Sequence, residues 1–499
     1  MENNPTASTE LNKPSPAETL VMLAKLKYEI IRTLEGDLLA IPLTGPKIAK
    51  PFKGMQNTLG DDLMSKYREM THKIPSERAI NDALRVLASD AYSQDPVKAH
   101  LRYARFGELI YIDIGDTTGN AIEIRPGSWS IVERPPVYFR RTILTAPLSR
   151  PVSGGNIANL FTIINVPTHL QSLLVGWLVA SMDPSIPHPI LAVNGEQGSG
   201  KSFASSKISS LVDPSPAPLQ SPPKDITSWI ELAAGAYGIS LDNLSKISDV
   251  FSDALCRAST GDSSVKRANY SDKDLVLHQF KRVIIINGIN LMEMRDDLAD
   301  RIIPMNLPVI SHESKQYESY LDEQWEQLYP EILGGLLDLC AKALERLPDV
   351  KLSSLPRMAD FARVLQALDE ICDTESLTQY REEIGKSASN SIDNDTFLKA
   401  LGNQIESSWT GTASELLDEM SSKMPYHVDK TWPQNSRQVT DKLARSAPTL
   451  RKVGWLIENL GSKNHSNAQR WMITPPASLA SHSFTLYTKD IEGKRSEAS

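Results

Sequence analysis

The stretch GEQGSGKS at residues 195–202 decides the fold of this chain. It fits the pattern G-x-x-x-x-G-K-[ST] at every fixed position. Its members are Gly195, Glu196, Gln197, Gly198, Ser199, Gly200, Lys201 and Ser202. The apolar run Ile190 to Asn194 before it predicts a short buried strand, and Phe203 to Leu211 after it predicts a helix. A strand, a glycine-rich loop and a helix in this order are typical of a phosphate-binding loop.

The chemistry of such a loop assigns a role to each of its polar residues. Glycines let backbone N–H groups turn towards a β-phosphate, and the helix N-terminus adds its positive dipole end. We expect Lys201 to bridge the β- and γ-phosphates and the hydroxyl of Ser202 to coordinate Mg²⁺. The sequence therefore predicts that residues 195–203, with Phe203 as the last, bind ATP and Mg²⁺.

The bulk composition is that of an ordinary globular protein, with 40% hydrophobic and 23% charged residues. At about 100–200 residues per domain, the 499 residues predict about three domains. The net charge of −8 excludes a surface that attracts nucleic acid everywhere, so any such contact must be a local patch.

Cysteine usage and hydropathy predict a cytoplasmic protein. The cysteines Cys256, Cys340 and Cys372 lie far apart without a C-x-x-C spacing, which argues against a disulfide framework or a zinc site. The longest apolar run, residues 170–182, is too short to span a bilayer. The N-terminus lacks a secretory signal pattern, so we expect no membrane partner.

The fold class that these patterns predict is α/β, with a P-loop ATPase core between an N-terminal α+β region and a C-terminal winged helix. In the N-terminal region, the helical spacing of Leu20, Leu23, Leu26, Ile30, Ile31 and Leu34 predicts a helix, and residues 59–91 are expected to be helical again. The expected parts are a disordered tail at 1–17, an N-terminal helical region at 18–95, a small antiparallel β domain at 96–150, the ATPase core at 151–310, a helical lid or collar at 311–373, a polar linker at 374–396, a winged-helix module at 397–476 and a tail at 477–499.

Two carboxylates in the β domain allow two interpretations. Asp113 and Asp116 could hold a metal ion, as in a primase. The alternative is a strand end that runs into a turn, and we favour it because no third carboxylate or histidine follows nearby.

Two further strands end in residues suited to nucleotide hydrolysis. The run Tyr237 to Leu241 is followed by Asp242, whose carboxylate could order the Mg²⁺ water shell. Asn243 stands where a Glu often serves as base, and its amide can position water but cannot accept the proton. A turn containing these two residues is the alternative. The second strand, residues 282–286, ends in Asn287, which could orient the attacking water.

Arg301 follows this second strand in the segment 297–301. An arginine at this place could act on the γ-phosphate bound by a neighbouring subunit. The alternative is an ion pair with Asp297 on a helix surface.

Two basic segments are candidates for DNA contact. The segment 260–270 contains Lys266, Arg267 and an aromatic residue, a content that suits a strand backbone and a stacked base, although an exposed turn is equally plausible. The second segment, residues 435–470, lies in a winged-helix pattern of two helices, expected at 414–424 and 435–447, and a β-hairpin with strands at 454–460 and 469–474. Its basic residues, which outnumber the acidic Asp441 and Glu458, are Arg437, Lys442, Arg445, Arg451, Lys452, Lys463 and Arg470. We expect Arg437, Lys442 and Arg445 to contact phosphates; a solvated face or a protein-binding module is the alternative.

In residues 151–308 the chain resembles the superfamily 3 helicases, in particular the poxvirus-type primase-helicases of viruses, phages and plasmids. The resemblance rests on residues 195–202, Asp242, residues 260–270, Asn287 and Arg301, in that order. The chain is also similar, in residues 252–261 and 300–301, to ATP-binding proteins of bacterial prophages and genomic islands.

This resemblance implies an AAA+-like hexamer with Lys266, Arg267 and Lys273 on a DNA-contacting hairpin in its channel. The chain departs from the pattern at Asn243, which replaces an acid, and by the absence of a convincing primase triad.

We therefore expect an ATP-dependent DNA helicase or translocase that acts in the replication of a phage or mobile element. A homo-oligomeric ring is expected because an arginine supplied in trans has no partner in a monomer. One alternative is a nucleotide-gated DNA-binding regulator with little turnover. Another is a defence or maintenance ATPase that acts on a protein partner.

Overall fold

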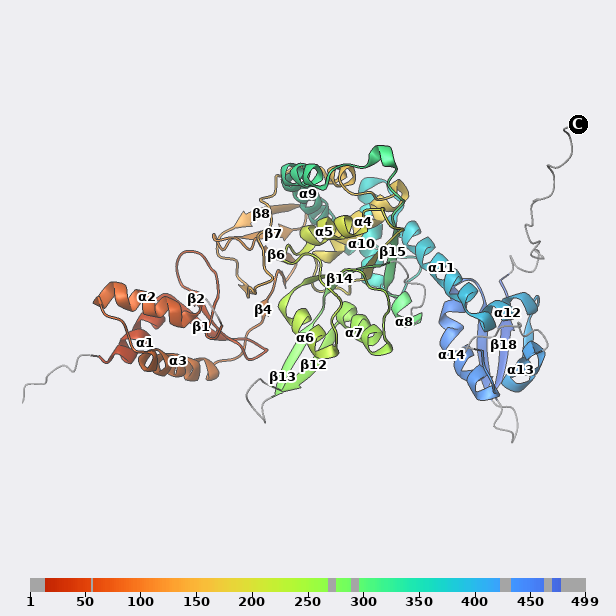
Figure 1. Ribbon diagram of the computed structural model, residues 1–499, viewed down its shortest axis with the longest axis horizontal. Coiled ribbons are helices and arrows are strands. Elements are labelled where there is room, and N and C mark those ends of the chain that lie inside the picture. Colours follow the sequence, from red (N-terminus) through yellow and green to blue (C-terminus); the bar gives the residue numbers. More distant parts are fainter. Residues whose placement is uncertain are drawn as a thin grey trace, which may run out of the picture. The chain divides into compact units, whose positions relative to one another are not determined.

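The computed structural model describes residues 14–54, 57–267, 275–288, 296–421, 432–461 and 469–476. The expected mixed α/β class is confirmed, with several separate sheets (Figure 1). The chain divides into two compact units, one within residues 1–291 and 301–380 and the other within residues 292–300 and 381–499. Among the described residues, no helix has the length and apolarity needed to cross a membrane.

The first part of the N-terminal region differs from the helix that its leucine pattern predicts, whereas the helical stretch predicted at 59–91 is present as two helices. Its elements are α1 (Pro16–Lys27), β1 (Tyr28–Arg32), β2 (Leu38–Pro42), β3 (Lys50–Pro51), α2 (Leu59–Thr71) and α3 (Glu77–Tyr92). The prediction of a helix through Ile30 and Ile31 is wrong because these β-branched residues pair with β2, where Ile30 lies opposite Ala40. The leucines of α1 and α3 share one core.

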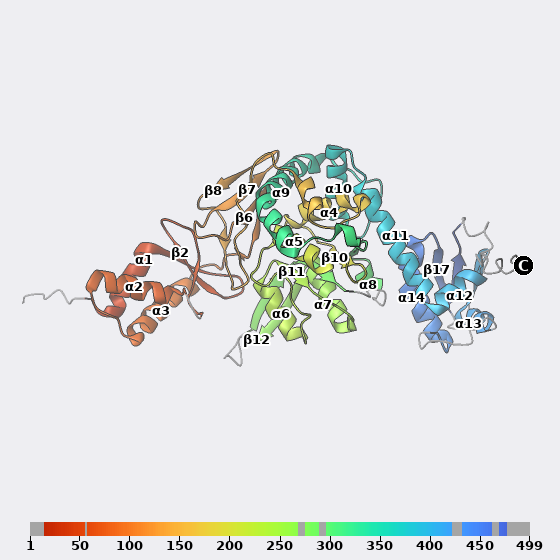
Figure 2. The ribbon, with the colours of Figure 1, turned by 45° about the horizontal axis from the view of Figure 1, so that its top comes forward.

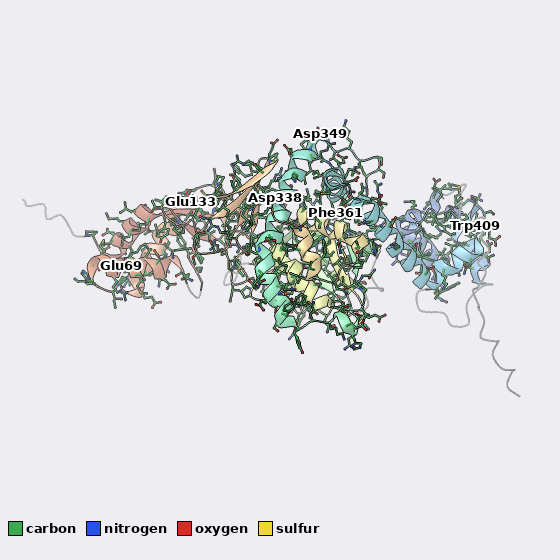
Figure 3. All side chains as sticks on the ribbon, turned by 90° about the horizontal axis from the view of Figure 1, so that it is seen from above. Glu69, Glu133, Asp338, Asp349, Phe361 and Trp409 are labelled. Atoms are coloured by element: carbon green, nitrogen blue, oxygen red, sulfur yellow. The ribbon has the colours of Figure 1, made fainter. Side chains whose placement is uncertain are left out.

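The next region contains the expected antiparallel sheet. Its strands, in spatial order, are β5 (Tyr103–Phe106), β6 (Leu109–Asp113), β7 (Ala121–Arg125) and β8 (Ser128–Val132). The strands β4 (Ala99–His100) and β9 (Tyr138–Phe139) do not belong to this sheet but pair with each other in parallel. The sheet packs on α9 (Glu318–Arg346), where Asp338, labelled in Figure 3, accepts a hydrogen bond from Trp129 Nε1 at 2.7 Å.

A parallel sheet forms the centre of the first unit. Its strands are β10 (Ile190–Asn194), β11 (Gly238–Leu241), β14 (Val283–Asn287) and β15 (Ile302–Asn306), in the order β11-β14-β10-β15. Nearly all of their residues are buried, as expected for parallel strands covered by helices. Figure 2 shows the helices around this sheet: α4 (Thr168–Ser181), α5 (Lys201–Val212), α6 (Ile226–Gly235) and α7 (Asp249–Thr260).

The remaining elements of this unit come between or after the strands of the parallel sheet in the chain, apart from η1, which precedes them. A hairpin of β12 (Asp262–Arg267) and β13 (Leu275–Phe280) precedes β14. The short helices are η1 (Ile157–Thr162), η2 (His312–Ser314) and η3 (Leu347–Asp349). The helices predicted after the sheet are present as α9 and α10 (Ala359–Cys372), and the ring of Phe361 on α10 lies 5.0 Å from that of Tyr380 (Figure 3).

The polar segment 374–396, expected as a linker, forms the helix α11 (Ser376–Asn394). The carboxylate of Asp369 accepts hydrogen bonds from the backbone N–H groups of Ser376 and Leu377, at 2.7 and 2.9 Å, so the first turn of the helix is capped. The sequence pattern did not predict this helix because its composition is polar. The helix is stabilised by its N-terminal cap and by a few buried residues.

The second unit combines helices with a three-stranded antiparallel sheet of order β16-β18-β17. Its elements are α8 (Asp296–Ala299), the later part of α11, α12 (Thr396–Gln404), β16 (Trp409–Thr412), α13 (Ala413–Ser421), α14 (Ser436–Lys452), β17 (Leu456–Gly461) and β18 (Arg470–Thr474). The sequence predicted α13, α14, β17 and β18 but neither α12 nor β16. Trp409 of β16, labelled in Figure 3, packs beside the core of this unit.

Candidate functional site

The glycine-rich loop joins the carboxyl end of β10 to the start of α5. Gly195, Gly198 and Gly200 have φ values of 150°, 84° and 79°, which only glycine adopts readily. A Cβ at Gly195 would lie 2.7 Å from the carbonyl oxygen of Leu307, so this position also lacks space for a side chain. Lys201 Nζ donates to the carbonyl oxygens of Gly195 and Glu196, each at 2.8 Å, so its ammonium group lies over the loop.

The other residues of the loop are arranged around this lysine. Glu196, Gln197 and Gly198 are exposed, whereas Ser199 is buried and its hydroxyl donates to the carbonyl oxygen of Glu196 at 2.9 Å. The half-buried ring of Phe203 lies 4.9 Å from Lys207 Nζ, a cation–π contact within α5. The side chain of Phe203 thus has a partner within its own helix.

Parallel pairing brings Asp242 and Asn287 to the loop. Leu241 of β11 lies opposite Ile286 of β14, and Val193 of β10 lies opposite Asn287. The carboxyl ends of three neighbouring strands therefore meet at one edge of the sheet. This order explains why residues far apart in the sequence become neighbours.

The side chains at this edge form a connected set of hydrogen bonds. Ser202 Oγ donates to Asp242 Oδ1 at 3.0 Å, and Asn287 Nδ2 donates to the same oxygen at 2.7 Å. Asn287 Nδ2 also lies 3.3 Å from Ser205 Oγ, and Asn287 is only 2% exposed. The predicted residues Ser202, Asp242 and Asn287 are thus in direct contact.

Asn243 differs from its neighbours because its side chain is exposed and its backbone is left-handed, with φ of 56°. Its backbone N–H donates to Asn287 Oδ1 at 2.7 Å. Asparagine tolerates this conformation better than most residues, which gives a local reason for its presence.

Arg301 lies at the opposite edge of the same sheet. It directly precedes β15, and its carbonyl oxygen accepts from the N–H of Ile190, the first residue of β10, at 2.7 Å. The five-residue strand β10 separates it from the loop by about 15 Å at 3.3 Å per residue. Arg301 therefore does not belong to the group of side chains around Lys201.

The predicted DNA-contacting residues of the hairpin are placed only in part. Lys266 and Arg267 lie on β12, opposite Val276 and Leu275 of β13. Lys273 lies outside the described residues.

The basic residues of α14 have different environments. Arg437 and Arg445 are exposed, and Arg445 Nε donates to the carbonyl oxygen of Asp441 at 3.2 Å. Lys442 instead pairs with Asp395 at 2.5 Å, with side-chain exposures of 14% and 21%. This ion pair joins α14 to the N-terminus of α12, where Asp395 also accepts from two backbone N–H groups.

Asp113 and Asp116 are engaged within the chain, and the turn interpretation is confirmed. Asp113 ends β6 and receives two hydrogen bonds from Arg141, at 2.8 and 2.7 Å. Asp116 accepts from the backbone N–H of Thr118 at 2.9 Å. Within the described ranges, no group of three or more His, Cys, Asp or Glu residues is placed to hold a metal ion.

Sequence reasoning missed several polar side chains that connect the elements around the site. Asn165 Nδ2 donates to the carbonyl oxygens of Pro308 and, at 3.4 Å, Ser199, which ties the loop to the segment after β15. The buried pair of Arg102 and Asp213 lies at the far end of α5. Neither residue belongs to a motif, so no local signal in the sequence distinguishes them from surface residues.

His188, between α4 and β10, is also buried and was not predicted. Its Nε2 lies 3.2 Å from the hydroxyl of Tyr237, which lies 2.7 Å from the carbonyl oxygen of Ser181. His188 Nδ1 has no hydrogen-bond partner among the described residues. Burial, aided by the charge of Lys281, lowers the pKa of His188 to about 3, so the ring is neutral at physiological pH.

Comparison with known proteins identifies two matched regions. Residues 157–389 match the family model described as the actinomycete integrative conjugative element replication protein, and residues 397–485 match the AICE RepA C-terminal domain. These matches support the coarser part of the expectation, a replication protein of a mobile-element family. The particular family named by the first model is that of actinomycete integrative conjugative elements, and its C-terminal domain follows it in the chain.

The solved structures that match the chain include two of the NrS-1 C-terminal region. The A form apo structure is 12% identical, covers 93% of this chain and 100% of its own, and has a TM-score of 0.39. Another apo structure of the region is 13% identical, with the same coverages and a TM-score of 0.35. No curated protein matches the chain.

Proposed function

We propose that this replication protein is an ATP-dependent DNA helicase or translocase. The observation that carries the proposal is the contact of Ser202 and Asn287 with the carboxylate of Asp242, beside a loop in which Lys201 lies over left-handed glycines. A hydroxyl, a carboxylate and an amide at the carboxyl edge of a parallel sheet suit the binding and hydrolysis of a nucleoside triphosphate.

The residues present fit ATP and Mg²⁺. Ser202 Oγ and Asp242 Oδ1 lie 3.0 Å apart, and both are hard oxygen ligands of the kind that Mg²⁺ binds through one or two protein groups, with waters and phosphates completing its shell. Mg²⁺ would neutralise charge on the phosphates, and Lys201 would leave its loop carbonyl oxygens to bind the β- and γ-phosphates.

Asn287 is the group that would orient the attacking water. Its Oδ1 is held by the N–H of Asn243 at 2.7 Å and its Nδ2 by Asp242, so the amide is fixed before substrate binds. Pre-organisation of this kind lowers the barrier to reaction because no group must reorient.

Arg301 would serve a neighbouring subunit. Because a strand length separates it from the phosphate loop of its own chain, its guanidinium group could complete only the site of another copy. The proposal therefore includes a homo-oligomeric ring.

The second unit would contact DNA. The element order α12, β16, α13, α14, β17 and β18 supports the proposal of a winged helix, in which the helix before the hairpin would enter the major groove. On α14, Arg437 and Arg445 are exposed for phosphate contact, and the β12–β13 hairpin with Lys266 and Arg267 would follow a single strand.

DNA-stimulated ATP hydrolysis by the full chain tests this function. We expect single-stranded or forked DNA to increase turnover, and Lys201→Ala to abolish it. Ser210→Ala is the matched control, because Ser210 lies on the same helix with its hydroxyl bonded to the carbonyl oxygen of Ser206 at 2.9 Å. Turnover that DNA leaves unchanged, or that survives in Lys201→Ala, would refute the proposal.

A second candidate is a nucleotide-gated DNA-binding regulator, which Asn243 favours because no carboxylate stands beside Asp242 to accept a proton. This candidate requires tight ATP binding, sequence-selective binding of duplex DNA and turnover near zero. Parallel measurement of nucleotide affinity and turnover separates it from a motor.

A further inference from the structure

A buried ion pair connects the antiparallel sheet to the parallel one. Arg102, directly before β5, donates from Nε to Asp213 Oδ1 at 2.8 Å, and the two side chains are 1% and 8% exposed. Asp213 is the residue that ends α5. A buried charge pair is costly to desolvate, so it persists only where hydrogen bonds satisfy its remaining atoms.

Each nitrogen of the Arg102 guanidinium group and each carboxylate oxygen of Asp213 has a hydrogen-bond partner. Arg102 also donates to the carbonyl oxygens of Asp113, at 2.9 Å, and Ala146, at 2.7 Å. Asp213 Oδ2 accepts from the backbone N–H groups of Tyr237 and Gly238, at 2.9 and 3.0 Å. Because Gly238 is the first residue of β11, one carboxylate joins the end of α5 to the start of β11.

Space around the pair is as restricted as its hydrogen bonding. A Cβ at Gly238 would lie 2.9 Å from Asp213 Cβ, and one at Gly115 would lie 2.6 Å from an Arg102 nitrogen. Tyr103 adds a second link, because its hydroxyl donates to the carbonyl oxygen of Val212 at 2.6 Å. These contacts fix the end of α5 in one position.

The opposite ends of these two elements carry the proposed Mg²⁺ ligands. Ser202 lies in the first turn of α5, and Asp242 directly follows β11. The 12 residues of α5 span about 18 Å at 1.5 Å per residue. The helix and the strand thus form two sides of a frame that is closed by Asp213 at one end and by Ser202 and Asp242 at the other.

We propose that Arg102 is a positioning residue for Mg²⁺ binding: by holding Asp213, it sets the separation between Ser202 and Asp242. This inference rests on the proposed function, since it concerns the same nucleotide site. The antiparallel sheet then contributes to the function of the proposed ATPase core. Loss of its contact with Asp213 would impair metal binding about one helix length away. A purely structural role for Arg102 would lower stability and leave the Mg²⁺ requirement unchanged.

The test measures binding of a non-hydrolysable ATP analogue by the full chain over a range of Mg²⁺ concentrations. We expect Arg102→Met to raise the Mg²⁺ concentration needed for half-maximal binding by about 10-fold or more, the range for residues that orient metal ligands. Affinity for the analogue without Mg²⁺ should change little. Arg102→Lys, which keeps the charge, should recover part of the shift and also serves if Arg102→Met does not fold.

The matched control is Arg141→Met, which removes the bidentate partner of Asp113 from the same sheet without touching Asp213. An unchanged Mg²⁺ requirement in Arg102→Met and Arg102→Lys, or an equal shift in Arg141→Met, would overturn the inference. The assay needs no turnover. A wild-type protein that binds the analogue with Mg²⁺ but does not hydrolyse ATP would therefore refute the proposed helicase or translocase and leave the inference about Arg102 open to the test.

Discussion

The amide nitrogen of Asn287 lies 2.7 Å from the carboxylate of Asp242, and the two residues stand at the ends of adjacent parallel strands. The contact is buried on the side of Asn287, whose own Oδ1 is occupied by the N–H of Asn243. Both polar atoms of this amide thus have assigned partners: Nδ2 donates to Asp242 and Ser205, and Oδ1 accepts from Asn243. A 180° rotation of the amide would lose all of these hydrogen bonds.

Asn287→Asp should strongly reduce ATP turnover. It replaces a donor to Asp242 by a second carboxylate, so the two like charges repel and the pKa of one carboxyl rises. We expect turnover at neutral pH to fall by about 10²–10³-fold, as for loss of a pre-organised donor. As pH falls, protonation restores a donor to Asp242, so turnover should partly recover in a pH–rate profile.

The control for this substitution is Asn306→Asp, at an exposed asparagine that ends β15, the strand on the far side of β10 from β14. It adds the same charge to the same edge of the sheet without contact to Asp242. An equal loss of turnover in both variants would show that added charge at this edge of the sheet, rather than loss of the amide contact with Asp242, reduces turnover.

Substitutions of Asn243 should separate backbone from side-chain effects. Its φ of 56° is strained for most residues, so Asn243→Ala should lower the free energy of unfolding by about 1 kcal/mol. Asn243→Gly relieves the strain and should keep the stability of the wild type. Urea denaturation measures both values, and equal stabilities of the two variants would contradict the backbone argument.

The same variants report on catalysis. If Asn243 has no role in proton transfer, Asn243→Gly keeps wild-type turnover, because its backbone N–H still donates to Asn287. A loss of turnover in a stable Asn243→Gly variant would instead show that the exposed amide contacts water or substrate.

Motif spacing predicted which residues surround the glycine-rich loop because strand–loop–helix signals are local. The strand before Gly195 and the helix after it were both found where the sequence placed them, and Asp242 and Asn287 followed from apolar runs ending in a polar residue. Their mutual contact depends on the order β11-β14-β10, which no short segment encodes.

The misses have a common physical origin in tertiary contacts. Ile30 and Ile31 kept the helical spacing of α1 but pair with β2, and the polar α11 is capped by Asp369 of the preceding helix. Arg102 and Asp213 come together only through folding, so neither carries a signal at the level of the sequence.

DNA binding should depend on Arg445 and Lys442 in different ways. Arg445 is exposed on α14, so Arg445→Ala should reduce the slope of log affinity against log salt by about 0.9, the value for one lost phosphate contact. Lys442 is paired with Asp395, so Lys442→Met should leave that slope unchanged. It should lower the free energy of unfolding by about 1–2 kcal/mol, a value between those typical of exposed and of buried ion pairs.

Fluorescence anisotropy over a series of salt concentrations measures the slopes. Arg437→Ala is a second test, because Arg437 is exposed on the first turn of the same helix. A full-sized decrease in slope for Lys442→Met would show that DNA breaks the pair with Asp395, and unchanged slopes for both arginine variants would exclude α14 as the contact.

His188 should make the folded state sensitive to acid. Its pKa is about 3 in the folded chain and about 6.5 when unfolded, so between these values only the unfolded chain binds the proton. Stability is therefore complete above pH 6.5 and falls as pH decreases, by about 1.4 kcal/mol per unit from this residue. His188→Gln keeps a polar side chain near Tyr237 but cannot titrate, so its loss of stability between pH 6.5 and pH 5 should be smaller than that of the wild type in urea denaturation. Equal pH dependence of the two proteins would mean that His188 Nδ1 reaches a proton acceptor in the folded state, and the burial argument would then be wrong.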